Sequence, residues 1–262
     1  MSDSHGKFCW YELLTTDPSA AGAFYTRVIG WNAEDSGLPG MAYTLFKIAG
    51  QGIGGVMTLP EEARQAGARP GWMGYIWVRD LDAAVEKLKA SGGRIYKPAE
   101  DIPSVGRFAV VADPQGAPFV LFRNFGDQEG PTHAPGTPGT VGWHELQALD
   151  REGAFSFYAD QFGWSKGDAM EMGEPVGIYQ IFSINGVQAG GMMKKTEESP
   201  IPFWRFYINV DGIDASVARV TEAKGKILSG PHQVPGGSWI VQGQDPQGAM
   251  FALVGPRVES HV

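Results

Sequence analysis

Two glutamates each lie two positions after a tryptophan, and their carboxyl groups could transfer protons. Glu12 follows Trp10, and Glu145 follows Trp143. Residues two apart on a β-strand share a face, so each carboxyl group is expected beside an indole ring. A carboxyl group that loses its hydration in an enclosed site titrates closer to neutral pH and can act as a general acid or base. The structural alternative is a carboxylate that binds backbone amides or an arginine and holds strand ends together.

Aromatic residues that recur in both halves of the chain could bind a flat organic molecule. Each such ring can bury about 150–250 Å², and small-molecule sites are mostly apolar with few polar groups. Ordinary core packing is the alternative for the same rings. Arg205, which corresponds to Met73 in the first half, could hold an anionic group or form a surface salt bridge. The candidate ligand-binding residues are Trp10, Trp72, Tyr75, Trp143, Trp204, Tyr207 and Arg205.

Histidine and cysteine offer little for metal binding. His144 is predicted on the strand face opposite Glu145, as a buried, hydrogen-bonded residue rather than a ligand. Position 148 is an alanine, so the sequence from His144 is not the zinc motif His-Glu-x-x-His. Cys9 is the only cysteine, which excludes a disulfide within the chain and a cysteine-based metal site.

The candidate residues belong to a duplicated unit. The segment from Trp10 to Trp31 returns from Trp143 to Trp164, and the offset is 133 positions at both ends (143 − 10 and 164 − 31). A duplication fixes the architecture before any local motif is considered.

The duplication predicts two tandem domains, at residues 6–125 and 141–256, with a Gly/Pro-rich linker at 126–140. The chain has 262 residues, 43% of them hydrophobic, so each domain can bury a core. The net charge of −8 without a basic cluster argues against nucleic acid and anionic membranes as partners. No apolar run approaches the ~20 residues of a membrane span, and the N-terminus is polar. We expect a cytoplasmic protein that is a monomer or a homodimer.

Helices and strands can be placed from the same pattern. Asp17 is a good N-cap for a helix that ends at Gly30, and Asp150 and Gly163 bound its counterpart. A second type of helix is predicted before Gly92 and again in the other half. The predicted strands of the first half cover residues 8–14, 43–48, 53–58, 108–112 and 119–122.

Two motifs carry a resemblance to a known family. A helix ending in Phe-Tyr-x-x-x-x-Gly-Trp and an Asp-Pro-x-Gly turn followed by an apolar strand occur in both halves. The chain resembles the glyoxalase/bleomycin-resistance/extradiol-dioxygenase (vicinal oxygen chelate) superfamily over nearly its whole length. The resemblance implies an α+β fold of two tandem domains, each made of two βαβββ modules that form a curved eight-stranded cup.

The resemblance also implies where metal-using relatives place their ligands. The corresponding positions hold Trp10 and Trp143 on first strands, Val120 and Ala252 on last strands, and Met73 and Arg205 on the first strands of the second modules. The remaining positions fall near 54–57 and 190–193. None of these supplies a carboxylate or an imidazole, and a divalent ion needs several converging oxygen or nitrogen ligands. We therefore expect no metal and no other cofactor.

The functional expectation is a glyoxalase-like protein that binds a small apolar or aromatic molecule in metal-free cups. One alternative is a lyase or isomerase that uses Glu12 and Glu145 for proton transfer. A second is a metal-dependent glyoxalase or dioxygenase with non-standard ligands. A third is an interaction protein whose cups are filled by its own side chains.

Overall fold

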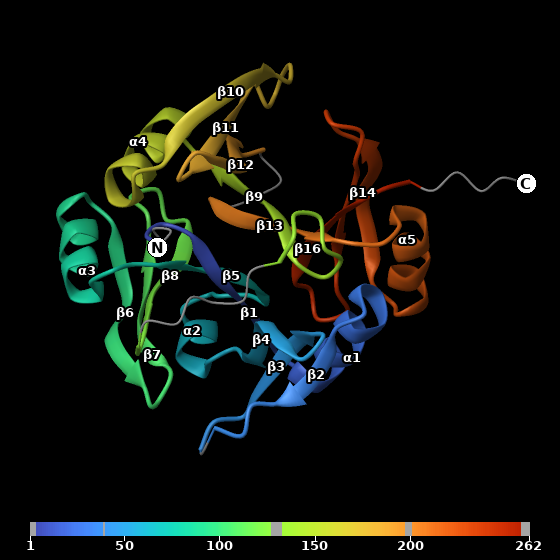
Figure 1. The fold of residues 1–262 in the computed structure, drawn as a ribbon, viewed down its shortest axis with the longest axis horizontal. Helices are drawn as coiled ribbons and strands as arrows, with labels where there is room; N and C mark the ends of the chain where they lie inside the picture. Colours follow the sequence, from blue (N-terminus) through green and yellow to red (C-terminus); the bar gives the residue numbers. More distant parts are fainter. Residues whose placement is uncertain (1–3, 39, 127–132, 197–200, 258–262) are drawn as a thin grey trace, which may run out of the picture. The chain divides into compact units, whose positions relative to one another are not determined.

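The computed structural model describes residues 4–38, 40–126, 133–196 and 201–257, which form two mixed sheets of eight strands (Figure 1). The strand orders are β2-β3-β4-β1-β5-β8-β7-β6 and β10-β11-β12-β9-β13-β16-β15-β14. The two orders are the same when eight is added to each strand number, as a duplication requires. The predicted fold class, α+β with two βαβββ modules for each sheet, is confirmed.

The first half contains three helices and eight strands: β1 (Phe8–Thr15), α1 (Pro18–Ile29), β2 (Asn32–Asp35), β3 (Tyr43–Ile48), β4 (Gln51–Thr58), α2 (Glu61–Gln65), β5 (Gly71–Trp77), α3 (Leu81–Ala90), β6 (Arg94–Ile102), β7 (Gly106–Ala112) and β8 (Pro118–Asn124). The second half contains β9 (Val141–Ala148), α4 (Arg151–Phe162), β10 (Ser165–Glu171), β11 (Ile178–Ile184), β12 (Val187–Lys194), β13 (Phe203–Asn209), α5 (Ile213–Glu222), β14 (Lys226–Gln233), β15 (Trp239–Gln244) and β16 (Met250–Gly255).

The helix limits follow from the residues predicted to set them. The Asp17 carboxylate accepts a hydrogen bond from the Ala20 amide at 3.0 Å at the start of α1. Gly30 ends this helix with a φ of 88°, in the left-handed region that a residue with a Cβ avoids. Asp150 caps α4 by accepting a hydrogen bond from the Glu152 amide at 3.1 Å. The short helix α2 was not predicted.

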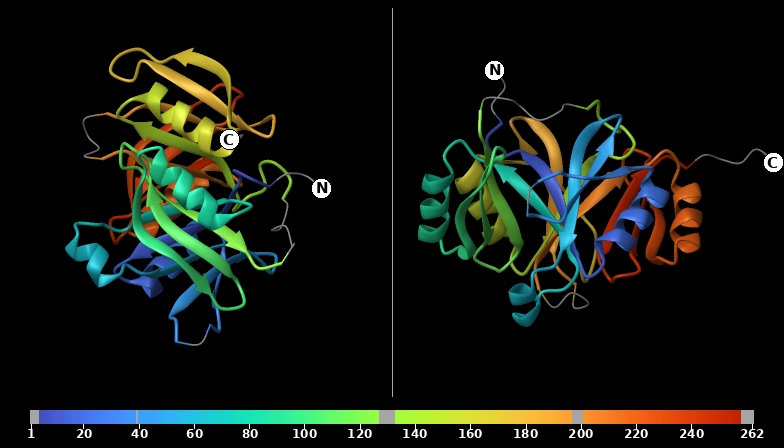
Figure 2. Two further views of the ribbon diagram at one scale, coloured as in Figure 1. Left: turned by 90° about the vertical axis from the view of Figure 1, so that its left-hand side faces the viewer. Right: turned by 90° about the horizontal axis from the view of Figure 1, so that it is seen from below.

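Contacts divide the chain into two compact units, and each unit draws on both halves of the sequence. The α1–α5 unit holds residues 11–72, 131–142 and 205–262, and the α3–α4 unit holds residues 1–10, 73–130 and 143–204. Figures 1 and 2 show α1 beside α5 in one unit and α3 beside α4 in the other. The predicted domain boundaries follow the duplicated sequence and remain a prediction. Residues 127–132 of the predicted linker lie outside the described residues.

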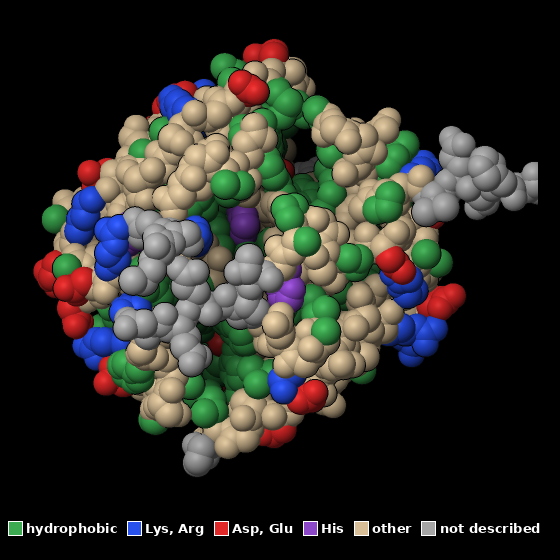
Figure 3. All heavy atoms as spheres, viewed as in Figure 1, with side chains coloured by type: hydrophobic (Ala, Val, Ile, Leu, Met, Phe, Trp, Pro, Cys, Tyr) green, Lys and Arg blue, Asp and Glu red, His purple; other side chains and the backbone are tan. Residues whose placement is uncertain are grey.

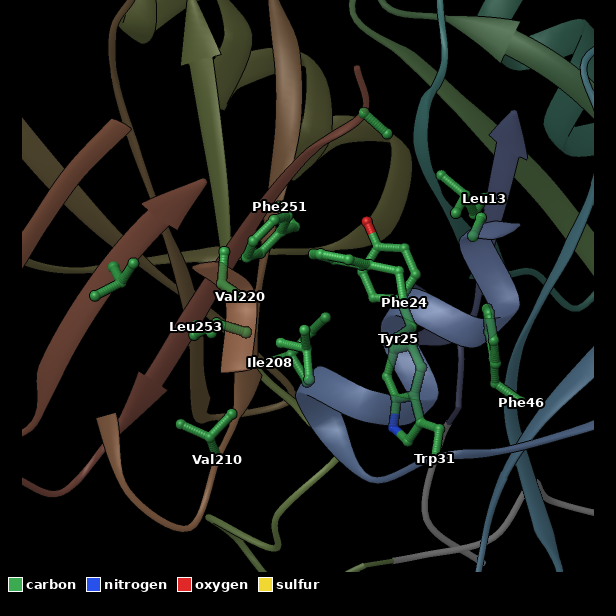
Figure 4. Close-up of a cluster of buried hydrophobic side chains, with 14 of the residues drawn as sticks. Leu13, Phe24, Tyr25, Trp31, Phe46, Ile208, Val210, Val220, Phe251 and Leu253 are labelled. Carbon is green, nitrogen blue, oxygen red and sulfur yellow. The ribbon is translucent and has the colours of Figure 1, made fainter. Parts of the chain in front are cut away.

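The core of the α1–α5 unit forms where the apolar face of α1 meets strands from both halves (Figure 4). Phe24 and Tyr25 of α1 are buried, and their rings lie 5.6 and 6.1 Å from that of Phe251 on β16. The other side chains labelled in this cluster are Leu13, Trp31, Phe46, Ile208, Val210, Val220 and Leu253. The apolar stripe of α1 is therefore buried against residues of both halves of the chain.

The core of the α3–α4 unit is dominated by aromatic rings. Trp164 stacks on Phe182 with 4.5 Å between centroids and an interplanar angle of 5°. The ring of Tyr158 on α4 also stacks on Trp164, with 5.1 Å between centroids. Stacked and edge-on pairs of this kind add to the free energy gained from burial.

Charged side chains of both signs are scattered over the face shown in Figure 3, without a large patch of one sign. Among the described residues, no helix is long and apolar enough to cross a membrane.

Candidate functional site

Three hydrogen-bonded side chains surround the carboxylate of Glu145. Glu145 lies on β9 and is 6% exposed. Its Oε1 accepts a hydrogen bond from Gln147 Nε2 at 3.2 Å, and its Oε2 accepts one from the Tyr179 hydroxyl at 3.5 Å. The Trp143 indole N–H donates to the same hydroxyl at 2.7 Å. We call these residues, Trp143, Glu145, Gln147 and Tyr179, the Glu145 network.

Local backbone geometry explains why these four residues meet. Trp143, Glu145 and Gln147 alternate along β9 and so share one face. Gly191 on β12 is the register partner of Glu145, and a Cβ added to this glycine would collide with the Tyr179 ring. The missing side chain at Gly191 therefore leaves the space in which Tyr179 reaches the carboxylate.

The first half repeats this backbone arrangement with one changed side chain. Glu12 is 7% exposed and pairs with Gly55, where an added Cβ would collide with the Tyr43 ring. Leu14 stands where the second half has Gln147 (147 − 133 = 14). Position 14 therefore offers no side-chain amide of the kind that Gln147 supplies to Glu145.

Trp72 and Trp204, two of the predicted ligand-binding residues, pack in the cores. Trp72 donates its indole N–H to the Tyr25 hydroxyl at 3.0 Å, and Trp204 donates to the Tyr158 hydroxyl at 3.0 Å. Trp204 is 4% exposed. Both indoles therefore have a structural partner already.

The other predicted ligand-binding residues are half-buried or buried on strands. Strand alternation puts Tyr75 on the face opposite Trp72, and it puts Arg205 and Tyr207 on the face opposite Trp204. Tyr207 is buried and accepts a hydrogen bond from Gln242 Nε2 at 3.0 Å. Tyr75 is also buried. Trp10 and Arg205 are half-buried.

Sequence reasoning missed Gln147, Tyr179 and Tyr43. A signal for Gln147 was present, because it lies two positions after Glu145 on the same predicted strand. For the tyrosines, glycine in a strand signals a close approach by another group, but the sequence does not say which.

Buried carboxylates also lie at the two Asp-Pro-Gln-Gly turns. Asp113 Oδ1 accepts hydrogen bonds from the amides of Gln115 and Ala117, both at 2.9 Å, and Oδ2 accepts one from the Tyr158 hydroxyl at 3.2 Å. Burial raises the pKa of Asp113 above its usual value and raises the pKa of Tyr158 well above 10.0. These carboxylates hold a turn and a helix together rather than face a site.

His144 lies on the other face of β9, as predicted, and is buried and hydrogen-bonded. Its Nδ1 lies 2.7 Å from the Ala189 carbonyl oxygen, and its ring stacks on Phe8 with 4.1 Å between centroids. Burial lowers the pKa of His144 to about 4, so the ring is neutral near pH 7.

The model of the Glyoxalase/Bleomycin resistance protein/Dioxygenase superfamily matches residues 7–121 and 140–253, and the chain belongs to this family. A Mycobacterium tuberculosis protein, CFP32, named as a candidate glyoxylase, is 33% identical over 253 residues, which cover 94% of each chain. The anthracycline biosynthesis protein DauV of a Streptomyces species is 30% identical over 260 residues, covering 95% of this chain and 93% of DauV.

Solved structures of the family share the fold. The Mn(II)-bound glyoxalase from Novosphingobium aromaticivorans superposes with a TM-score of 0.63 at 15% identity, covering 99% of this chain and 85% of that one. The 2,2',3-trihydroxybiphenyl 1,2-dioxygenase of Sphingomonas wittichii superposes with a TM-score of 0.67 at 14% identity, covering 97% and 91%. At these identities the likeness concerns the fold alone.

The residues at the expected ligand positions do not fit a divalent metal ion. Val120 and Ala252 are apolar and fully buried. The Gly55 and Gly191 positions are covered by tyrosine rings. Within the described ranges, no group of three or more His, Cys, Asp or Glu residues could hold a metal ion. We therefore derive no chemistry through a metal.

Proposed function

We propose that the second half binds a flat, hydroxyl-bearing aromatic molecule at the Glu145 network, without a metal ion. The observation that carries the proposal is a carboxylate, 6% exposed, held by two side-chain donors on a strand face beside an indole. An anionic oxygen held in this way is a strong acceptor for a ligand hydroxyl. The half-buried Trp143 supplies an apolar surface next to it.

The name of one relative, DauV, supports an aromatic ligand. DauV is named for anthracycline biosynthesis, and anthracyclines contain flat fused rings with hydroxyl groups. The first half would bind such a molecule less well, because Leu14 replaces the amide of Gln147. Trp10, Tyr75, Tyr207 and Arg205 remain predicted ligand-binding residues outside the Glu145 network, whereas Trp72 and Trp204 pack in the cores through hydrogen bonds to Tyr25 and Tyr158.

Binding of 1,4-dihydroxyanthraquinone, followed by its fluorescence, tests the proposal. Glu145→Gln keeps the size of the side chain but removes the negative charge. We expect the variant to bind at least about tenfold more weakly, because a charge-assisted hydrogen bond is lost. Glu86→Gln, an exposed change on α3, is the matched control and should bind like the wild type. Equal affinities for the two variants would contradict a role for Glu145.

A second candidate function, proton transfer by Glu145 in a lyase or isomerase, is favoured by one distance. The Tyr179 hydroxyl is 3.5 Å from Oε2, a long hydrogen bond that a substrate proton could replace. The hemithioacetal of methylglyoxal and glutathione is a suitable substrate probe. Turnover by the wild type that Glu145→Gln abolishes, while binding persists, supports the enzyme. If neither protein turns over the probe, the binding function stands alone.

A further inference from the structure

A separate pocket lies at the end of the β11–β12 hairpin in the α3–α4 unit. Its volume is about 410 Å³. His144, which lines this pocket, directly precedes Glu145 on β9, so its side chain points to the opposite face of the strand. The pocket is therefore distinct from the Glu145 network. We call it the Lys7 pocket; it is lined by Lys7, Phe8, His144, Ile184, Asn185, Val187 and Ala189.

The walls of the Lys7 pocket are mostly apolar and aromatic. The Phe8 and His144 rings stack with an interplanar angle of 9°, which fixes one wall. Ile184 is 7% exposed and forms part of the floor, whereas Val187 is 69% exposed and stands at the rim. Because burial lowers the pKa of His144 to about 4, this ring brings no charge at neutral pH.

Lys7 gives the pocket its charge. It is the only charged residue in the lining, and none of the ion pairs between described residues involves it. The chain as a whole carries a net charge of −8. A lone ammonium group beside apolar walls favours an organic anion over a neutral molecule or a cation.

We propose that the Lys7 pocket binds a small aromatic carboxylate. The carboxylate pairs with the Lys7 ammonium group, and the ring lies against Phe8 and Ile184. The volume suits a molecule of one or two rings, since ligand sites typically measure about 300–1,000 Å³. A carboxylate is repelled by Glu145, so this ligand differs from the one proposed for the Glu145 network, and the two proposals are independent.

Titration calorimetry with 2-naphthoate and its neutral analogue 2-naphthamide tests the pocket. We expect Lys7→Ala to weaken 2-naphthoate binding by about tenfold while leaving 2-naphthamide binding nearly unchanged, because only the ion pair is lost. Val187→Trp enlarges an exposed lining residue, so we expect the variant to fold like the wild type and to block both probes. Lys89→Ala, on the exposed side of α3, is the charge-matched control and should bind like the wild type.

The outcomes separate this proposal from the proposed function. Glu145→Gln should leave 2-naphthoate affinity within about twofold of the wild type, because the two sites use opposite faces of β9. The pocket proposal is overturned if the wild type shows no saturable 2-naphthoate binding, or if Lys7→Ala and Lys89→Ala bind equally well. It is also overturned if Val187→Trp binds normally, or if Glu145→Gln abolishes binding.

Discussion

The hydroxyl of Tyr25 donates a hydrogen bond to the Asp245 carboxylate at 3.2 Å, although the two residues are 220 positions apart. Tyr158 makes the same bond to Asp113, also at 3.2 Å. In both cases the helix of one half is tied to the Asp-Pro-Gln-Gly turn of the other half. The two motifs that mark the family in the sequence thus meet in space, once in each compact unit.

Removal of one tyrosine hydroxyl should destabilise the protein strongly. Tyr25→Phe leaves the indole N–H of the half-buried Trp72 and one oxygen of the buried Asp245 without their hydrogen-bond partner. We expect a loss of about 2 kcal/mol in the free energy of unfolding, and a similar loss for Tyr158→Phe. Urea unfolding followed by tryptophan fluorescence measures both. Tyr96→Phe is the control, because Tyr96 is 57% exposed and should change little. A Tyr25→Phe midpoint equal to that of the control would contradict this prediction.

A methyl group at Gly191 should disrupt the Glu145 network. Gly191→Ala places a Cβ in the space of the Tyr179 ring, so the ring must move away from Glu145 and Trp143. We expect a stability loss of about 1–3 kcal/mol and a shift of the Trp143 indole N–H resonance in NMR spectra. Gly212→Ala is the control, since Gly212 has extended backbone and open space around its Cβ position. An unchanged indole resonance would show that Tyr179 does not need this glycine.

His144 should make the protein less stable as the pH falls. Its pKa is about 4 in the folded chain and 6.5 in the reference state, so the unfolded chain binds the proton first. Its contribution to stability is complete above pH 6.5 and is lost as the pH falls towards 4. Between about pH 7 and pH 5 we expect a loss of about 2 kcal/mol that is absent in His144→Phe, which keeps a ring against Phe8. Denaturant unfolding at both pH values checks this; parallel pH profiles for the two proteins would refute it.

The one side chain that differs between the Glu145 network and its first-half counterpart (Trp10, Glu12, Leu14 and Tyr43) can be exchanged. Gln147→Leu gives the second half the residue of the first half and removes the amide donor to Glu145. We expect it to weaken 1,4-dihydroxyanthraquinone binding and to lower stability by about 1–3 kcal/mol, because the buried carboxylate loses a partner. Leu14→Gln, the reverse change beside Glu12, should raise the affinity or leave it unchanged. Fluorescence titration compares the variants, and tighter binding by Gln147→Leu would count against the proposed site.

The elements were predictable because their signals are local. The Asp17 cap, the Gly30 stop and the apolar stripe of α1 all lie within one short segment, and the structure places the helix at Pro18–Ile29. The prediction that Trp143 and Glu145 share a strand face rests on the period of two and is confirmed by their connection through Tyr179. The sequence did not predict that Trp72 packs in the core, because an aromatic residue on a strand can either bind a ligand or fill a core.

By itself, the sequence determined the duplication and the carboxylate on each first strand, since both can be read from residue spacing, whereas the eight-stranded sheets were what the resemblance to the family implied. Tertiary structure decided which tyrosine lies over Gly191, which rings enter the cores, and that each compact unit combines modules of both halves. The physical reason is that strand pairing and helix packing bring together side chains as far apart as Tyr25 and Asp245, and no local pattern encodes such a distance.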